Sequence, residues 1–274
     1  MTITTPDLFN VHDRVVLITG GYGVLGGSMA RALAAAGARV AILGRRADAA
    51  NALVAALEDA GGRALALVGD VVDRDSLLAA RDVLFAAWGG IDVLVNAAGG
   101  NVARARTDNV LPFGMPMDAF DEVLRLNLHG TVLPSLVFGE SMAAQQRGSI
   151  INISSMASTQ ALSGVMGYSA AKAAVENFTK WLAVDLAKKC GDGIRVNAIS
   201  PGFFIADQNR AVLVNADGTW TPRATAVLAK TPMGRFGKHD ELHGVLRFLA
   251  SDASSFVTGT VIPVDGGFSA FTGV

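Results

Sequence analysis

Cysteine and histidine are scarce in this sequence, and each scarcity excludes a class of site. The single cysteine, Cys190, cannot form an internal disulfide. A lone cysteine suits a reducing compartment, so we expect a cytoplasmic protein. Among the four histidines, His239 and His243 lie four residues apart, but no glutamate directly follows the first of them, so the zinc-protease pattern is missing. We therefore expect no metal site.

An excess of one charge and long apolar runs are also missing. The formal net charge is -1, and no basic patch favours binding to nucleic acid. No apolar stretch reaches the ~20 residues that a helix needs to cross a bilayer. Residues 1–6 lack the basic-then-apolar order of a secretory signal. The sequence therefore predicts no nucleic-acid partner and no membrane segment.

Apolar residues, in contrast, are abundant. They make up 51% of the 274 residues and charged residues make up 17%, which allows a substantial core. Seven short runs rich in Val, Ile, Leu and Ala are predicted strands: 14–19, 39–43, 64–68, 91–95, 149–153, 194–199 and 261–264. Because polar residues do not alternate within them, the runs indicate a parallel sheet covered on both faces.

Longer segments between these runs predict helices at 24–36, 47–60, 75–87, 117–146, 168–189 and 238–250. Strand-helix-strand units of about 30 residues suit right-handed crossovers. We therefore predict an α/β fold, a doubly wound parallel sheet (Rossmann fold) with helices on both faces, in a single domain over residues 1–274. Residues 202–236 break the alternation and predict a binding loop or lid.

A glycine-rich turn joins the first predicted strand to the first predicted helix. It reads Thr-Gly-Gly-Tyr-Gly-Val-Leu-Gly over residues 19–26. Glycines let a pyrophosphate approach the backbone, and the helix N-terminus adds free N–H groups and a positive dipole end. A tight turn without a ligand is the alternative, but its place after the first strand favours a dinucleotide site. The predicted cofactor residues are Gly20, Gly21, Tyr22, Gly23, Val24, Leu25 and Gly26.

The ends of the next strands refine this prediction. Arg45 and Arg46 follow the second strand, where an acidic residue would bind ribose hydroxyls and arginine suits a 2′-phosphate. The pair favours NADP, but the glycine turn holds no further basic residue, so NAD stays open. Asp70 suits the adenine amino group, with a helix cap as its alternative role. The other predicted cofactor residues are Val71, Asn96, Ala97, Ala98 and Gly99.

Two residues one helical turn apart carry the clearest chemical signal. Tyr168 and Lys172 are four residues apart, so a helix places them on one face. A cation beside a phenol lowers the phenol pKa from about 10, which makes it a usable proton donor or acceptor near neutral pH. Ser155 ends a strand thirteen residues upstream. We expect Ser155 in the same cleft, donating to a carbonyl oxygen, although turn formation alone also explains a serine there.

The joint pattern resembles the short-chain dehydrogenase/reductase family over almost the whole chain. It consists of Thr19-Gly20 to Gly26, Asn96 to Gly99, Asn127, Ser155, Tyr168, Lys172, Pro201-Gly202 and Asp265-Gly266-Gly267. The resemblance implies an NAD(P)-dependent oxidoreductase that interconverts a secondary alcohol and a ketone, usually as a homotetramer. It implies that Asn127 supports a proton-relay water and that Pro201 and Gly202 pack near the nicotinamide. Lys172 would hold the nicotinamide ribose. One departure is Val24, where the shorter members usually carry glycine.

Several segments are similar to a narrower group, the D-mannonate oxidoreductases or fructuronate reductases, which act on hexuronates. They include Asn-Ile-Ser-Ser-Met from residue 152, Thr-Pro-Met-Gly-Arg-Phe-Gly from residue 231 and the tail from Pro263. The carboxylate of such a substrate needs a cation, while solvated surface arginines are the alternative interpretation. The predicted substrate residues are Asn101, Arg104, Arg106, Gln208, Asn209 and Arg210.

Three other interpretations stay open. The substrate could be another small carbonyl compound, because the resemblance to the narrower group carries less weight than the resemblance to the family. The protein could be a redox sensor without chemistry, but the complete set of Ser155, Tyr168 and Lys172 argues against it. It could be an epimerase or dehydratase that recycles its nicotinamide, for which the glycine spacing is the only support.

Overall fold

The computed structural model describes residues 7–108 and 111–273, and its centre is one parallel sheet. The strands are β1 (Val15–Thr19), β2 (Arg39–Gly44), β3 (Arg63–Val68), β4 (Val93–Asn96), β5 (Gly148–Ile153), β6 (Ile194–Pro201) and β7 (Val261–Val264). They pair in the order β3-β2-β1-β4-β5-β6-β7, and every pair is parallel. The strand order reverses between β1 and β4, which is where this kind of sheet binds ligands.

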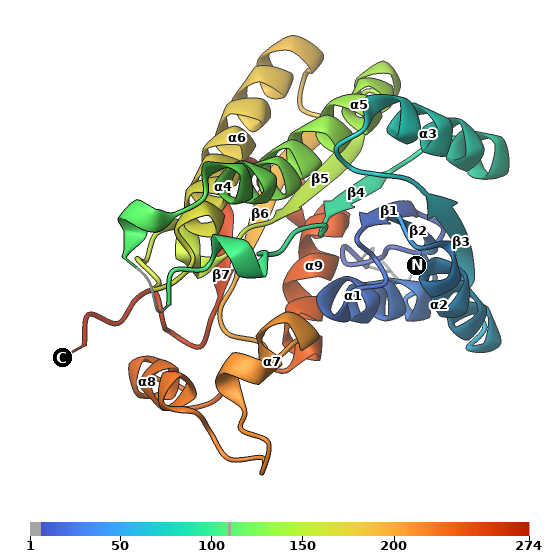
Figure 1. The fold of residues 1–274 in the computed structure, drawn as a ribbon. Helices are drawn as coiled ribbons and strands as arrows, with labels where there is room; N and C mark the ends of the chain where they lie inside the picture. The colour runs from blue at the N-terminus through green and yellow to red at the C-terminus, as the bar shows by residue number, and fades with distance from the viewer. Residues whose placement is uncertain (1–6, 109–110, 274) are drawn as a thin grey trace.

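Helices cover both faces of the sheet, as Figure 1 shows. One face carries α1 (Val24–Ala35), α2 (Ala47–Asp59) and α9 (His243–Ala250), and the other carries α3 (Arg74–Trp88), α5 (Gly130–Gln145) and α6 (Met166–Cys190). Successive strand residues point to opposite faces, so Ile18 packs in the first layer and Leu17 in the second. Burial on both sides explains the continuously apolar strands, and the predicted Rossmann fold is confirmed.

The predicted helix over residues 117–146 forms one continuous helical segment, but it is not a regular α-helix throughout. α4 covers Met117–Leu124, a π-helical turn covers Arg125–His129, and α5 begins at Gly130. The π turn contains Asn127, whose side chain is fully buried. Such a turn adds a residue without breaking the overall apolar pattern, so the sequence does not reveal it. Turns of this kind are frequent at functional sites.

Residues 202–236, predicted as a loop or lid, contain two short helices. These are α7 (Asp207–Leu213) and α8 (Pro222–Lys230), which stand outside the two helical layers in Figure 1. Pro222 suits the first turn of α8, where its missing N–H has no partner to lose. Thr221 caps the same helix by accepting a hydrogen bond from the Ala224 N–H at 3.1 Å. In the part of the chain that the structure describes, no helix has the length and apolar character of a membrane span.

Candidate active site

The carboxyl ends of the first four strands surround a cleft of about 350 Å³. The end of β2 contributes Gly44 and Arg45, and the end of β3 contributes Asp70 and Val71. The glycine turn and the end of β4 supply most of the remaining lining: Gly20, Tyr22, Gly23, Val24, Leu25, Gly26, Ala97, Ala98 and Gly99. Most of the predicted cofactor residues therefore lie around one cleft.

The glycine turn leaves no space for a side chain at Gly20 or Gly26. A Cβ on Gly26 would lie 2.6 Å from the carbonyl oxygen of Gly20, and a Cβ on Gly20 would lie 2.8 Å from the Cα of Ala98. Gly20 also has a φ of +62°, which favours glycine. Gly23 caps α1 without a side-chain hydrogen bond, so the N–H groups of the first helical turn can face a phosphate. This cradle fits the pyrophosphate of a dinucleotide.

The two arginines predicted to select NADP lie in different places. Arg45 is exposed and lines the cleft. Arg46 lies outside the cleft lining, with its guanidinium 4.8 Å from the centre of the Tyr22 ring. The backbone N–H of Arg46 donates to the Tyr22 hydroxyl at 3.3 Å. Gly44 makes room for the ring, because a Cβ there would overlap it. Only Arg45 is therefore placed to meet a cofactor phosphate.

Three other predicted cofactor residues, Asp70, Gly21 and Asn96, differ in how they lie relative to the cleft. Asp70 Oδ1 accepts a hydrogen bond from the Val72 N–H at 3.1 Å while Asp70 lines the cleft. Gly21 lies beside the cleft rather than in its lining. Asn96 is buried, and its Nδ2 donates to Ser135 Oγ and Asn152 Oδ1, both at 2.9 Å. The Asn96 side chain therefore ties β4 to β5 instead of entering the cleft.

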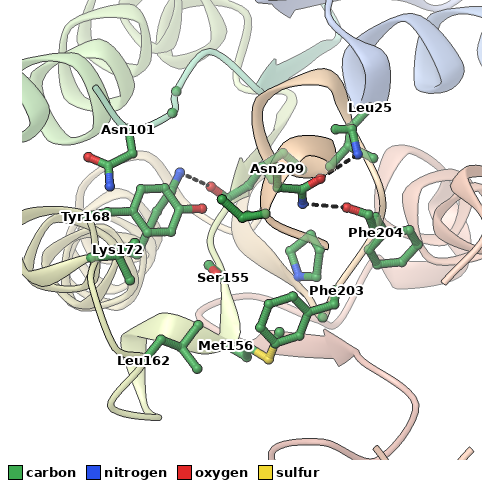
Figure 2. Close-up of a pocket in the computed structure, with 18 of the residues that line it drawn as sticks. Leu25, Asn101, Ser155, Met156, Leu162, Tyr168, Lys172, Phe203, Phe204 and Asn209 are labelled. Atoms are coloured by element: carbon green, nitrogen blue, oxygen red, sulfur yellow. Dashed lines mark hydrogen bonds between the residues drawn. The ribbon is translucent and has the colours of Figure 1, made fainter. Parts of the chain in front are cut away.

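A second pocket, also of about 350 Å³, adjoins the cleft and is drawn in Figure 2. The two cavities share the lining residues Leu25, Ala97, Gly99 and Ala206. The predicted catalytic and nicotinamide residues in the second pocket are Ser155, Tyr168, Lys172, Pro201 and Gly202. A dinucleotide with its phosphates at the glycine turn could therefore reach these groups with its other end. We call this second cavity the substrate pocket.

Ser155, Tyr168 and Lys172 converge on the substrate pocket. Tyr168 and Lys172 lie one turn apart in α6, and Ser155 follows the end of β5. The Lys172 Nζ lies 5.6 Å from the centre of the Tyr168 ring and donates to the carbonyl oxygen of Ile153 at 2.7 Å. The ammonium group is therefore fixed between the tyrosine and the end of β5.

The pKa of Tyr168 differs from the prediction. Burial raises the pKa of this phenol from its usual value, and the nearby Ser155 hydroxyl opposes the rise in part. Burial also lowers the pKa of Lys172 to about 8, since removal from water disfavours a charge. The predicted lowering by Lys172 is wrong for these residues by themselves, because burial raises the phenol pKa and Lys172 is not among the groups that lower it. Tyr168 is therefore protonated at neutral pH, as a proton donor must be.

Asn127 forms hydrogen bonds with the backbone of the loop that follows β4. Its Oδ1 accepts a hydrogen bond from the Gly100 N–H at 3.0 Å, and its Nδ2 donates to the Gly100 carbonyl oxygen at 2.7 Å. Its own carbonyl oxygen accepts from Thr131 Oγ1 at 2.9 Å. A Cβ on Gly99 would lie only 2.7 Å from Asn127 Oδ1. Asn127 therefore fixes the backbone between the two cavities, outside the pocket lining.

Glu176 is a supporting residue that sequence reasoning missed. Its carboxylate accepts hydrogen bonds from Ser154 Oγ at 2.8 Å and Ser158 Oγ at 2.5 Å, and these serines flank Ser155. The Glu176 side chain is buried, so the bonds hold the segment that carries Ser155. Its spacing in the sequence could have identified it, because Glu176 lies one helical turn after Lys172 on the same face of the helix.

The predicted substrate residues fall into two groups. Asn101 lines the substrate pocket, and its Nδ2 is buried without a hydrogen-bond acceptor among the described residues. Asn209 lines the pocket as well, but its side chain is occupied by the backbone. Its Oδ1 accepts a hydrogen bond from the Ala206 N–H, and its Nδ2 donates to the Phe204 carbonyl oxygen, both at 2.8 Å. Asn209 therefore shapes the start of α7, while Asn101 keeps a free donor.

The predicted arginines also differ in whether they line the substrate pocket. Arg104 and Arg210 lie outside the pocket lining. Arg104 pairs with Asp118 at 2.6 Å and Glu122 at 2.9 Å, which neutralise it on the surface. Arg106 does line the pocket, together with Arg223 of α8, which sequence reasoning missed. The side chain of Gln208 is outside the described part of the structure.

Known proteins share this architecture. A family model described as enoyl-(acyl carrier protein) reductase matches residues 23–269. The uncharacterized oxidoreductase UxuB of Bacillus subtilis is 44% identical, over 97% of this chain and 98% of UxuB. The chain belongs to the short-chain dehydrogenase/reductase family, and it is an NAD(P)-dependent oxidoreductase that acts on CH–OH groups.

Two solved structures extend the comparison. A protein from Haemophilus influenza, described as a candidate D-mannonate oxidoreductase with bound NAD, has a TM-score of 0.91 and 40% identity over 97% of this chain and 98% of its own. A gluconate 5-dehydrogenase from Burkholderia cenocepacia, in complex with NADP and tartrate, has a TM-score of 0.85 and 37% identity over 96% and 98%. Relatives therefore bind either nicotinamide cofactor.

Proposed function

We propose that this protein interconverts a secondary alcohol and a ketone of a sugar acid, such as D-mannonate and D-fructuronate, with NADP preferred over NAD. The observation that carries the proposal is the substrate pocket, where Ser155 and Tyr168 face the same space as two arginines and Asn101. Protonated donors suit a carbonyl oxygen, and the cations suit a carboxylate. The relatives described as D-mannonate oxidoreductase and gluconate 5-dehydrogenase support a sugar acid.

In ketone reduction, Ser155 and Tyr168 donate hydrogen bonds to the substrate carbonyl oxygen. The bound nicotinamide supplies the hydride that reaches the carbonyl carbon. Negative charge then grows on the oxygen, where the two hydroxyl groups stabilise it. Tyr168 transfers its proton to that oxygen, which completes the alcohol, and the Lys172 ammonium stabilises the phenolate that remains. Alcohol oxidation uses the same groups in reverse, with the phenolate accepting the proton.

The preference for NADP is proposed from Arg45, which lines the cleft where the adenosine ribose would lie. A homotetramer and a cytoplasmic location stay predictions. Trp181 and Val184 leave 60% and 54% of their surface exposed on α6, and an exposed apolar patch supports association with further copies of the chain.

A substrate panel tests the reaction. Consumption of reduced nicotinamide would be followed with D-fructuronate, its neutral counterpart D-fructose, and the apolar ketone cyclohexanone, each with NADPH and with NADH. We expect the highest kcat/KM for D-fructuronate with NADPH. Faster turnover of the neutral ketones would reject a sugar acid as substrate. No turnover with any compound, at retained cofactor affinity, would instead favour the redox sensor.

The variant Tyr168→Phe tests the catalytic residue. It should lower kcat by about 100-fold or more, because the proton donor is lost, while NADPH titration shows nearly unchanged cofactor affinity. A near-normal kcat in Tyr168→Phe would show that another group supplies the proton.

A further inference from the structure

Two arginines and an aspartate join three separate segments at the wall of the substrate pocket. Asp108 Oδ2 accepts a hydrogen bond from Arg106 Nε at 2.7 Å, and Asp108 Oδ1 accepts from Arg223 Nη1 at 3.3 Å. Arg223 also donates to the hydroxyl and the carbonyl oxygen of Ser163, both at 3.1 Å. This Arg106–Asp108–Arg223 cluster links the loop after β4, the helix α8 and the segment that precedes α6.

The backbone and the partial burial of the side chains both favour the Arg106–Asp108–Arg223 cluster. Gly164 has a φ of +77°, and a Cβ on it would overlap the Asp108 carboxylate, so the carboxylate is seated on this glycine. The side chains of Arg106, Arg223 and Asp108 are 29%, 28% and 27% exposed. Partial burial means that salt screens these charges less than it screens charges on an open surface.

The charge of the pocket favours an anion. Among the described lining residues, the charged groups are Arg106, Lys172 and Arg223, and no carboxylate lines the pocket. Asp108 lies outside the lining, and the two arginines hold its pKa below the usual value. The cluster therefore carries one surplus positive charge at neutral pH. Arg106 donates a hydrogen bond from Nε to Asp108. No described residue accepts a hydrogen bond from the two Nη groups of Arg106, so these groups are available to an anion.

We infer that Arg106 and Arg223 bind the carboxylate of the substrate, and that α8 thereby selects acidic over neutral polyhydroxy substrates. Asp108 orients both guanidinium groups from outside the pocket. The unpartnered Nδ2 of Asn101 supplies a second donor in the same pocket, suited to a hydroxyl oxygen of the substrate. This inference rests on the proposed function, since it names what holds the far end of the same substrate.

Binding, rather than turnover, tests the inference separately from the reaction. The affinities of D-mannonate and of the uncharged D-mannitol would be measured by titration calorimetry in the presence of saturating NADPH, the reduced cofactor, which cannot oxidise either alcohol. Wild-type protein should bind the acid more tightly. Arg223→Gln should reduce the ratio of the two affinities about tenfold or more, because an arginine–carboxylate contact is lost. Arg81→Gln is the matched control, since Arg81 is a similarly buried, ion-paired arginine of α3 outside the pocket.

Asp108→Asn gives a second, opposite test, which also serves if Arg223→Gln does not fold. It removes the competing negative charge and keeps one of the two acceptor oxygens, so one of the two arginine contacts of Asp108 remains. The acid should therefore bind more tightly than to wild type. Unchanged affinity ratios in Arg223→Gln, or weaker acid binding in a folded Asp108→Asn, would overturn the inference. A protein that binds the acid as expected but reduces no sugar acid would instead overturn the proposed function alone.

Discussion

Lys172 combines deep burial with a charge, and this combination costs folding free energy. Its side chain is 4% exposed, and burial lowers its pKa from 10.5 to about 8. A shift of this size corresponds to a destabilisation of the folded state by roughly 3 kcal/mol at neutral pH. The hydrogen bond to the Ile153 carbonyl oxygen offsets about 1 kcal/mol of it or slightly more. Lys172→Met should therefore lose activity and yet unfold at a higher temperature, by roughly 2–4 °C for each kcal/mol gained.

The pH dependence of this difference checks its cause. The folded-state pKa of Lys172 lies below its unfolded value, so the penalty is complete below about pH 8 and disappears as pH rises toward about 10.5. The difference between Lys172→Met and wild type in thermal unfolding, followed by circular dichroism, should thus shrink between about pH 7 and pH 9.5. A difference that stays constant over this range would attribute the effect to packing rather than to charge.

Single residues differ in how far the sequence reveals them. Tyr168 and Lys172 could be predicted because both lie on one helix, where spacing alone fixes their relative position. Arg104 and Arg223 could not, because their roles depend on partners far along the chain. Asp118 and Glu122 neutralise Arg104, whereas Arg223 reaches the pocket only through the placement of α8.

The glycine turn and the start of α1 depend on close backbone contact. A Cβ on Gly26 would lie 2.6 Å from the Gly20 carbonyl oxygen, and a backbone atom cannot move aside as a flexible side chain can. Gly26→Ala should lower the free energy of unfolding by about 1–3 kcal/mol and weaken NADPH binding, because the phosphate cradle changes shape. Urea unfolding and NADPH titration measure the two effects.

The same substitution in α9 is the control for the glycine turn. Gly244 has open space where a Cβ would be added, and alanine is the better helix former by about 0.5–1 kcal/mol. Gly244→Ala should therefore be as stable as wild type or more so, with unchanged cofactor affinity. If Gly26→Ala matched Gly244→Ala in both measurements, the close approach in the turn would have no energetic consequence.

The strands could be predicted more completely than the helices. Burial on both faces gives most of the inner strands a mainly apolar run, which is a local signal. The π-helical turn at Arg125–His129 could not be predicted, because it only inserts a residue into a helical segment and leaves the apolar pattern of that segment unchanged. α8 has a local signal in Thr221 and Pro222, but its docking through Arg223 on Ser163 is a tertiary contact.

The arrangement of the whole sheet explains why much of the site could be predicted. In a parallel sheet all strands end at one edge, so residues after β1, β2, β3, β4 and β5 must meet there whatever their separation in the chain. The glycine turn, Arg45, Asp70, Gly99 and Ser155 follow from this rule. Residues of the excursion between β6 and α9 are not positioned by the sheet, and this is where Arg223 was missed.

The response of the whole molecule to its cofactors tests the NADP preference. A ligand that binds only the folded state stabilises it by about 2.7 kcal/mol at 100 times its Kd. At equal concentrations NADPH should therefore raise the unfolding temperature more than NADH does. Arg45 lines the cleft, so Arg45→Gln should reduce the NADPH shift to that of NADH and leave the NADH shift unchanged. Arg46, which stacks on Tyr22 outside the lining, should have the smaller effect on substitution by Gln. Equal shifts for the two cofactors in wild type would remove the preference, because a 2′-phosphate held by Arg45 must add binding free energy that NADH cannot supply.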